Sequence, residues 1–179
     1  MGSARINQLQ KNNFHRLPAT MRIQYFFIVF TLLFASCGSD RFYEANQDIG
    51  EQGWRETQVL EFKLDIPDAS QPYSIFYTVR YSNNYPNYNL YVKDYISDTT
   101  GKIILEKLQG MDLFKPTTGA PFGSGFGGNY DYMILGVPEF KFPHNGQYTF
   151  KVKQYMRQDP LKGIVAFGIR LEKAKAKQM

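Results

Sequence analysis

Cysteine is almost absent from this 179-residue sequence and histidine is rare: Cys37 is the single cysteine, and there are two histidines. One cysteine excludes an intrachain disulfide, and these counts exclude the Cys/His sites that bind structural zinc. Only His144 follows Cys37, and it lies in a turn at residues 143–146, where a histidine is more often solvated than catalytic. We therefore expect no enzyme, no metal and no cofactor.

Long hydrophobic runs are also lacking, since a membrane span takes about 20 residues. Residues 25–34 (YFFIVFTLLF) have the length of a signal-peptide core and follow Arg22. They predict an export signal rather than a permanent anchor. Residues 1–20 are polar and show no periodicity, so Met21 is the better translation start, and the alternative is an unusually long leader.

Acidic residues are missing from residues 1–36, which hold four of the five excess positive charges: Arg5, Lys11, Arg16 and Arg22. Three further lysines lie at the C-terminus, at positions 173, 175 and 177. The part between is slightly acidic, although the whole chain has a net charge of +5. Because neutralising phosphates requires a basic surface, we expect no nucleic-acid binding.

A lipobox follows the signal core. Phe34-Ala35-Ser36-Cys37 combines a bulky apolar residue, two small residues and a cysteine. Cleavage between Ser36 and Cys37 would make Cys37 the N-terminus, and acyl chains on it would anchor the protein, because each buried CH₂ contributes about 0.8 kcal/mol. A free or buried cysteine is the alternative. The lack of a disulfide partner favours lipidation of Cys37.

The sequence divides into four regions. Residues 1–36 are the leader and signal peptide, and residues 37–53 are the lipidated cysteine followed by a polar, glycine-bounded tether. Residues 54–173 have the length of one domain, and residues 174–179 form a basic tail.

Residues 54–173 show the pattern of β-strands. Residues 59–66 (VLEFKLDI) alternate, with Leu60, Phe62 and Leu64 on one face and charged residues on the other. Turn residues such as Pro138 separate the segments, and no convincing long amphipathic helix is found. Further strands are expected at residues 74–81, 90–96, 102–107, 133–137, 139–142, 147–155 and 163–173. The pattern predicts an all-β fold, an antiparallel β-sandwich of the jelly-roll or Ig-like type.

Two features resemble active-site motifs. A glycosidase needs two neighbouring carboxylates, but most of the candidates are expected on solvated faces and in turns: Asp94, Asp98, Asp131 and Glu139. Residues 119–128 (GAPFGSGFGG) contain a formal G-x-G-x-x-G, yet no βαβ unit surrounds it, so we expect no dinucleotide site. These residues instead predict a long loop, and long loops are often functional.

This loop, residues 117–132, is the expected contact surface for a partner protein. Four glycines surround Phe126, so that an apolar ring is presented on backbone that no regular strand would accommodate. Ordering such a segment costs about 1 to 2 kcal/mol per residue, and Phe122 and Phe126 must either fold back onto the sandwich or dock into another protein. The expected contact residues are Phe122, Phe126, Tyr130, Asp131 and Tyr132.

Several segments, taken in order, resemble those of a known family. They are the lipobox ending at Cys37, Trp54 leading into residues 59–66, residues 81–92 (YSNNYPNYNLYV), the Gly-rich loop ending in residues 128–131, residues 142–150 (FPHNGQYTF) and residues 163–173. In this succession the chain resembles the GldH gliding-motility lipoproteins of the Bacteroidetes. The resemblance implies a non-enzymatic component of the gliding apparatus and its associated secretion machinery, which acts through contacts with other envelope proteins.

A glycan-binding envelope lipoprotein is the alternative, with sugar rings stacked on exposed tyrosines such as Tyr85, Tyr88, Tyr130 and Tyr132. Trp54 is expected in the core. The residues after Cys37 (GSDR) lack the acidic run that surface-directed lipoproteins of this phylum often carry. We therefore expect attachment to the outer membrane on its periplasmic face.

Overall fold

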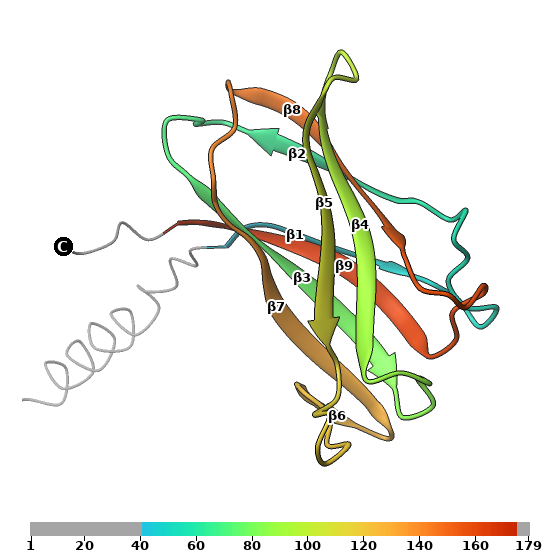
Figure 1. Cartoon of the computed structure of the whole chain (residues 1–179). Helices are drawn as coiled ribbons and strands as arrows, with labels where there is room; N and C mark the ends of the chain where they lie inside the picture. Colours follow the sequence, from blue (N-terminus) through green and yellow to red (C-terminus); the bar gives the residue numbers. More distant parts are fainter. Residues whose placement is uncertain (1–40, 175–179) are drawn as a thin grey trace, which may run out of the picture. The chain divides into compact units, whose positions relative to one another are not determined.

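A computed structural model describes residues 41–174 (Figure 1). This part of the chain holds nine strands: β1 (Arg41–Asp48), β2 (Leu60–Ile66), β3 (Tyr73–Ser82), β4 (Asn89–Asp98), β5 (Ile103–Asp112), β6 (Ser124–Phe126), β7 (Asn129–Phe140), β8 (Gly146–Gln154) and β9 (Ile164–Lys173). Residues 41–174 contain no helix capable of crossing a membrane. The predicted all-β class is confirmed.

Two antiparallel sheets pack against each other as a sandwich (Figure 1). The five-stranded sheet has the order β1-β9-β3-β7-β6, and the four-stranded sheet has the order β2-β8-β4-β5. The pairs are nested, because β4 pairs with β5, β3 with β7, β2 with β8 and β1 with β9. Strands paired in this nested way form one long antiparallel hairpin, which is folded so that its strand pairs alternate between the two sheets. The sandwich is therefore a jelly roll rather than an Ig-like fold.

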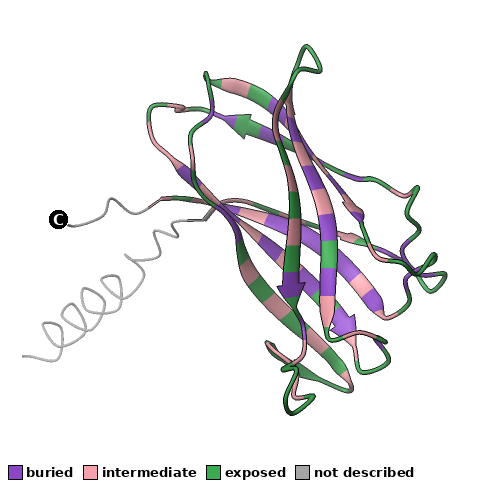
Figure 2. Ribbon diagram, viewed as in Figure 1, coloured by how far each residue is buried: buried purple, intermediate pink, exposed green. Residues whose placement is uncertain are grey.

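The core lies between the inner faces of the sheets (Figure 2). Buried residues recur at every second position along β2, β3, β4 and β8, whereas β9 is buried at four consecutive positions, 166–169. In β2 the alternation is complete, and Leu60, Phe62 and Leu64 are buried as the sequence predicts. Trp54 is fully buried, packs on Phe167 with ring centroids 5.3 Å apart and donates from Nε1 to a backbone carbonyl at 2.9 Å. Its predicted place in the core is confirmed.

The expected tether is wrong for Arg41–Asp48, which form strand β1 at the edge of the five-stranded sheet. Along this strand Tyr43 and Ala45 pack against the core, whereas Glu44 and Asn46 face the solvent. An edge strand pairs on one side only, and its polar outer residues give it the composition of a linker. The folded domain therefore begins well before Trp54.

Pro138 does not separate two strands, as the turn residues suggested, but lies within β7. The register between β3 and β7 shifts between Tyr73 and Ile75, where β7 carries one extra residue. This is a β-bulge, a place in a sheet where proline is tolerated. Glu139 takes a positive φ of 49° at the same point.

The two ends of the five-stranded sheet differ in what they present (Figure 1). At one end, here named the Arg41 end, β1 begins and Arg41 pairs with Glu172 near the close of β9. At the other, the hairpin end, Ser82 pairs with Asn129 and the β6–β7 hairpin projects. The ten residues of β3 connect the two ends. At about 3.3 Å per residue they are roughly 30 Å apart.

Candidate functional site

The predicted contact loop is in part a tight hairpin. Phe126 of β6 pairs with Asn129 of β7, so that Gly127 and Gly128 alone form the turn. Their φ values are 66° and 81°, and positive φ at both central residues is typical of a type I′ turn. The expectation of an irregular loop is thus wrong for Ser124–Phe126 and for the start of β7. The Phe126 side chain is 97% exposed.

A glycine is required where the two hairpin strands come closest. A Cβ atom at Gly125 would lie 1.8 Å from the carbonyl oxygen of Asn129. No larger residue fits there without moving the strands apart. The glycines of the formal G-x-G-x-x-G motif therefore serve the hairpin, which is flanked by strands only.

Phe122 and the two tyrosines of β7 fold back onto the sandwich. Phe122 stacks on Tyr132 with ring centroids 5.7 Å apart and an interplanar angle of 18°, and Lys115 Nζ lies 6.0 Å from the centroid of the Phe122 ring. Tyr130 packs against Tyr81 with centroids 5.5 Å apart. Of the two phenylalanines, Phe122 packs and Phe126 projects.

The hydroxyl of Tyr81 holds the segment before the hairpin in place. It donates a 2.6 Å hydrogen bond to the carbonyl oxygen of Leu113 and also contacts the carbonyl oxygen of Phe122. The Phe122 amide donates to the Leu113 carbonyl at 2.8 Å. Burial raises the pKa of Tyr81 to about 12. Both ends of residues 113–122 are therefore bound to Tyr81 of β3, so the segment that leads into the hairpin is held in one position.

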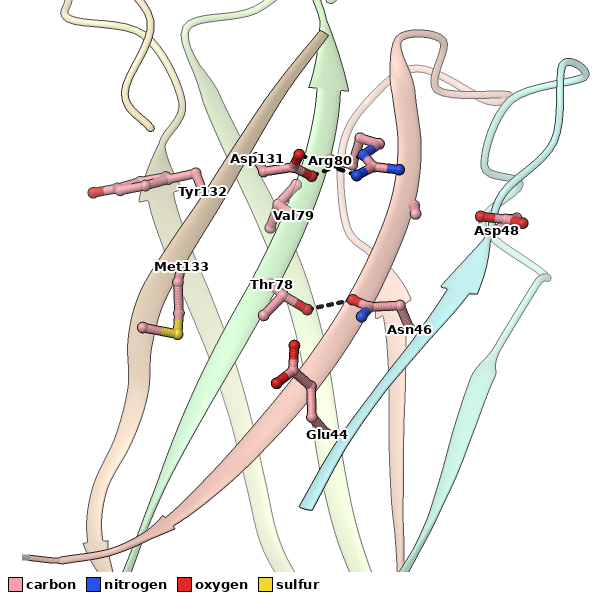
Figure 3. A pocket seen from close by; sticks show the side chains of 10 residues that line it. Glu44, Asn46, Asp48, Thr78, Val79, Arg80, Asp131, Tyr132 and Met133 are labelled. Carbon is pink, nitrogen blue, oxygen red and sulfur yellow. Dashed lines mark hydrogen bonds and ion pairs between the residues drawn. The ribbon is translucent and has the colours of Figure 1, made fainter. Parts of the chain in front are cut away.

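Asp131, the remaining predicted contact residue, lines a groove of about 410 Å³ on the outer face of the five-stranded sheet (Figure 3). Thr78 Oγ1 donates to Asn46 Oδ1 at 2.5 Å, and this bond passes over β9 at Gly168. A Cβ atom at Gly168 would come within 2.1 Å of Asn46 Oδ1. The groove walls come from β1, β3 and β7: Glu44, Asn46, Asp48, Thr78, Arg80, Asp131, Tyr132 and Met133.

A bidentate ion pair orients Asp131 in this groove. Arg80 Nε donates to Oδ1 at 2.8 Å and Nη2 donates to Oδ2 at 3.0 Å. The hydrogen bond and the charge of Asp131 raise the pKa of Arg80. Both side chains are more than half exposed, so the pair contributes about 1 kcal/mol or less to stability. Its effect is to fix the direction of two charged groups beside the hairpin.

Three of the four tyrosines expected to stack on sugars are not available. Tyr85 is buried, and its hydroxyl donates to the Asn89 carbonyl at 2.7 Å. Tyr130 and Tyr132 are half-buried in aromatic contacts, which leaves Tyr88 exposed. Ser36 and Cys37, with the rest of the leader and the end of the basic tail, lie outside the described residues.

Asp94 is a buried residue that sequence reasoning placed wrongly in solvent. It is fully buried, accepts a 2.7 Å hydrogen bond from the Tyr77 hydroxyl at Oδ2, and has no partner at Oδ1. Burial raises its pKa. The signal was present in the alternation of β4, which puts Asp94 on the same face as Leu90 and Val92. The other three carboxylates fit the prediction, since Asp131 and Glu139 are exposed and Asp98 accepts hydrogen bonds in the β4–β5 turn.

His144 lies in the predicted turn and is exposed, but it is not merely solvated. Its Nδ1 contacts the hydroxyl of Tyr148, and the two rings meet edge to face with centroids 5.5 Å apart. The histidine therefore packs at the Arg41 end of the sandwich, close to the start of β8.

Comparisons with known proteins give a consistent picture. A family model described as GldH lipoprotein matches residues 41–171. The gliding motility lipoprotein GldH homolog of Christiangramia forsetii is 31% identical over 84% of this chain and 94% of its own length. The gliding motility lipoprotein GldH of Flavobacterium johnsoniae is 27% identical over 79% of this chain and 90% of its own.

Among solved structures, dimeric latent PorU from Porphyromonas gingivalis aligns with 78% of this chain and 14% of its own, at 7% identity and a TM-score of 0.33. The family match, by contrast, begins at the first residue of β1 and ends within β9, so it spans both sheets. The chain belongs to the GldH family of gliding-motility lipoproteins.

Proposed function

We propose that this lipoprotein is held by acyl chains on Cys37 in the outer membrane, on its periplasmic face, and docks onto other proteins of the gliding apparatus and its associated secretion machinery. It acts by binding and not as an enzyme. The observation that carries the proposal is the fully projecting ring of Phe126 at the hairpin end, opposite the end at which the chain arrives from Cys37.

The length of chain before β1 supports this orientation. Cys37 precedes Arg41 by four residues, which reach at most about 14 Å when fully extended. This is a shorter connection than the expected tether to residue 53. A lipid on Cys37 would keep the Arg41 end close to the bilayer and leave the hairpin end roughly 30 Å farther along β3. The hairpin would then face a partner rather than the membrane.

The hairpin and the groove form one continuous surface. Phe126 pairs with Asn129 and Ser124 pairs with Asp131, so these side chains share the outer face of the five-stranded sheet. Met133, next along β7, is also exposed. Burying a phenylalanine ring against a partner contributes about 2 to 3 kcal/mol, and the Arg80–Asp131 pair beside it supplies oriented charge. The arrangement fits a docking site with an apolar anchor and a polar surround.

Site-specific crosslinking tests the contact. A photoreactive benzoylphenylalanine at position 126 of the lipidated protein should crosslink to an envelope protein in intact source cells. The same group at position 144, an exposed site at the Arg41 end, serves as the control and should give a different pattern or none. If the two positions capture the same proteins, the hairpin has no specific partner.

Labelled fatty acid tests the anchor. Cys37→Ala should block acylation and leave the precursor unprocessed or the product without lipid. Incorporation of label into this variant would show that Cys37 is not the acylated residue.

Protease digestion of intact cells tests the membrane face. On the periplasmic face the domain should survive until the outer membrane is opened. Rapid loss of the domain without lysis would place it on the cell surface instead.

A further inference from the structure

Two exposed tyrosines lie side by side on the outer face of the four-stranded sheet. Val92 of β4 pairs with Gln154 of β8, and one residue farther the Tyr155 amide donates to the Tyr91 carbonyl at 2.8 Å. Tyr91 and Tyr155 are therefore directly opposite, with side chains on the same face, and 41% and 51% of their surfaces are exposed. In such pairs the Cβ atoms are about 5 Å apart. We call Tyr91 and Tyr155 the tyrosine platform.

The tyrosine platform is supported by β5 under the Tyr91 ring and by the buried side chain of Gln154 next to Tyr155. The Tyr91 ring lies over Gly110 of β5, where a Cβ atom would come within 2.6 Å of the ring. Gln154 is fully buried, and its side chain accepts from the Met156 amide at 2.6 Å and donates to the Gln158 carbonyl at 3.1 Å. Residues 155–158 are thus fixed by a buried polar side chain, and the site needs little ordering when a ligand arrives.

Polar groups surround the platform in a cavity of about 290 Å³. Asn87 Nδ2 donates to Gln158 Oε1 at 2.8 Å, which leaves the Asn87 oxygen and the Gln158 amide hydrogens available. The guanidinium of Arg157 is exposed and makes no hydrogen bond or ion pair within residues 41–174. The lining contains no carboxylate: Asn87, Tyr91, Tyr155, Met156, Arg157 and Gln158.

We propose that this cavity binds one ring of an acidic glycan. The apolar face of a pyranose ring packs on Tyr91 and Tyr155, its hydroxyls bond the two amides, and a carboxylate on the sugar meets Arg157. An extended peptide fits this place poorly, because β4 lies between β8 and β5 and has no free edge to pair with. The inference concerns residues other than those of the hairpin and goes beyond the proposed function. It also replaces the set of sugar-stacking tyrosines expected from the sequence.

Binding to two glycan probes tests the proposal. The acidic probe is peptidoglycan glycan strand freed of its peptides, in which each N-acetylmuramic acid carries a carboxylate. The neutral probe is chitotetraose, a related glycan without that group. The full-length lipidated protein in nanodiscs should bind the acidic strand saturably and more tightly than chitotetraose.

Matched variants assign the binding to the platform. Tyr155→Ala should lower affinity for the acidic strand about tenfold or more. Arg157→Gln should reduce acidic-strand affinity to the chitotetraose level, and because Arg157 has no partner in the described chain, it should leave thermal unfolding unchanged. Tyr88→Ala serves as the control, because Tyr88 is also 51% exposed but does not line the cavity, and it should bind like the unmodified protein.

Two results would overturn the proposal. One is the absence of saturable binding of the acidic strand at millimolar concentration. The other is wild-type affinity in both Tyr155→Ala and Arg157→Gln. Phe126→Ala should bind the acidic strand normally, because the hairpin and the tyrosine platform are separate sites. Either of the two results above would therefore leave crosslinking at position 126 unaffected, which distinguishes failure of the glycan proposal from failure of the proposed function.

Discussion

The hydroxyl of Tyr77 in β3 donates a 2.7 Å hydrogen bond to Oδ2 of Asp94 in β4, which links the two sheets through the core. Lys107 of β5, whose positive charge lowers the pKa of Asp94 less than burial raises it, donates from Nζ to the backbone carbonyl of Gly136 in β7 at 2.7 Å. Burial raises the pKa of Asp94 and also that of Tyr77. The core therefore favours the neutral form of both groups.

Asp94→Asn should change how stability depends on pH. The folded-state pKa of Asp94 is above its unfolded value, so the folded state binds more protons between the two values. Stability should fall as pH rises through this window, by at most about 1.4 kcal/mol per pH unit, the limit for one proton. Asparagine keeps an oxygen for Tyr77 and cannot ionise. Urea unfolding from pH 4 to 8 should show the variant gaining relative to wild type as pH rises, and parallel profiles would contradict the neutral form of Asp94.

Tyr81→Phe should loosen the segment before the hairpin. The variant loses the hydroxyl that contacts the Leu113 and Phe122 carbonyls. Because the Leu113 carbonyl keeps the Phe122 amide as a donor, the expected cost is that of a single hydrogen bond, about 1 kcal/mol. Hydrogen exchange at the Phe122 amide should become faster. The control, Tyr88→Phe, removes a hydroxyl from an exposed side chain and should change neither quantity. Unchanged exchange in the Tyr81 variant would show that Tyr81 does not hold residues 113–122.

Gly125→Ala should disrupt the hairpin while the sandwich stays folded. The added Cβ would collide with the Asn129 carbonyl, and β6 pairs with three residues of β7 only. Amide protection at the start of β7 should fall, with little change in the main unfolding transition. Ser124→Ala, one residue earlier on the same strand, is the control. Wild-type amide protection in Gly125→Ala would contradict this prediction, because it would show that β6 and β7 stay paired with a Cβ atom at position 125.

The central strands were predictable because the apolar residues in their sequences mark the positions that are buried. Apolar residues recur at every second position along β2, β3, β4 and β8, and β9 is apolar from Ile164 to Ile169, so each of these strands shows a buried face in its sequence. β1 was missed because an edge strand has polar outer residues and looks like a linker. β6 was missed because its three residues lie among glycines, and its pairing depends on the turn rather than on β propensity.

The candidate sites were less predictable than the strands. The exposure of Phe126 was one of two outcomes left open, since the sequence does not show whether a ring next to glycines folds back. The tyrosine platform depends on the register between β4 and β8, which places Tyr91 opposite a residue 64 positions later. Such pairing arises only from the rolled topology. Asp94, in contrast, could have been found by following the alternation of β4 through a charged residue.

Phe126→Ala tests the central claim, that the hairpin end docks onto a partner protein. The measurement is quantitative recovery of the protein that crosslinks at position 126, copurified with the lipidated variant and with wild type at equal abundance. Because the ring is 97% exposed, thermal stability should be nearly unchanged while recovery of the partner falls about tenfold or more. Undiminished recovery, or a loss of stability of about 3 to 5 kcal/mol as for a buried phenylalanine, would contradict the docking role of Phe126.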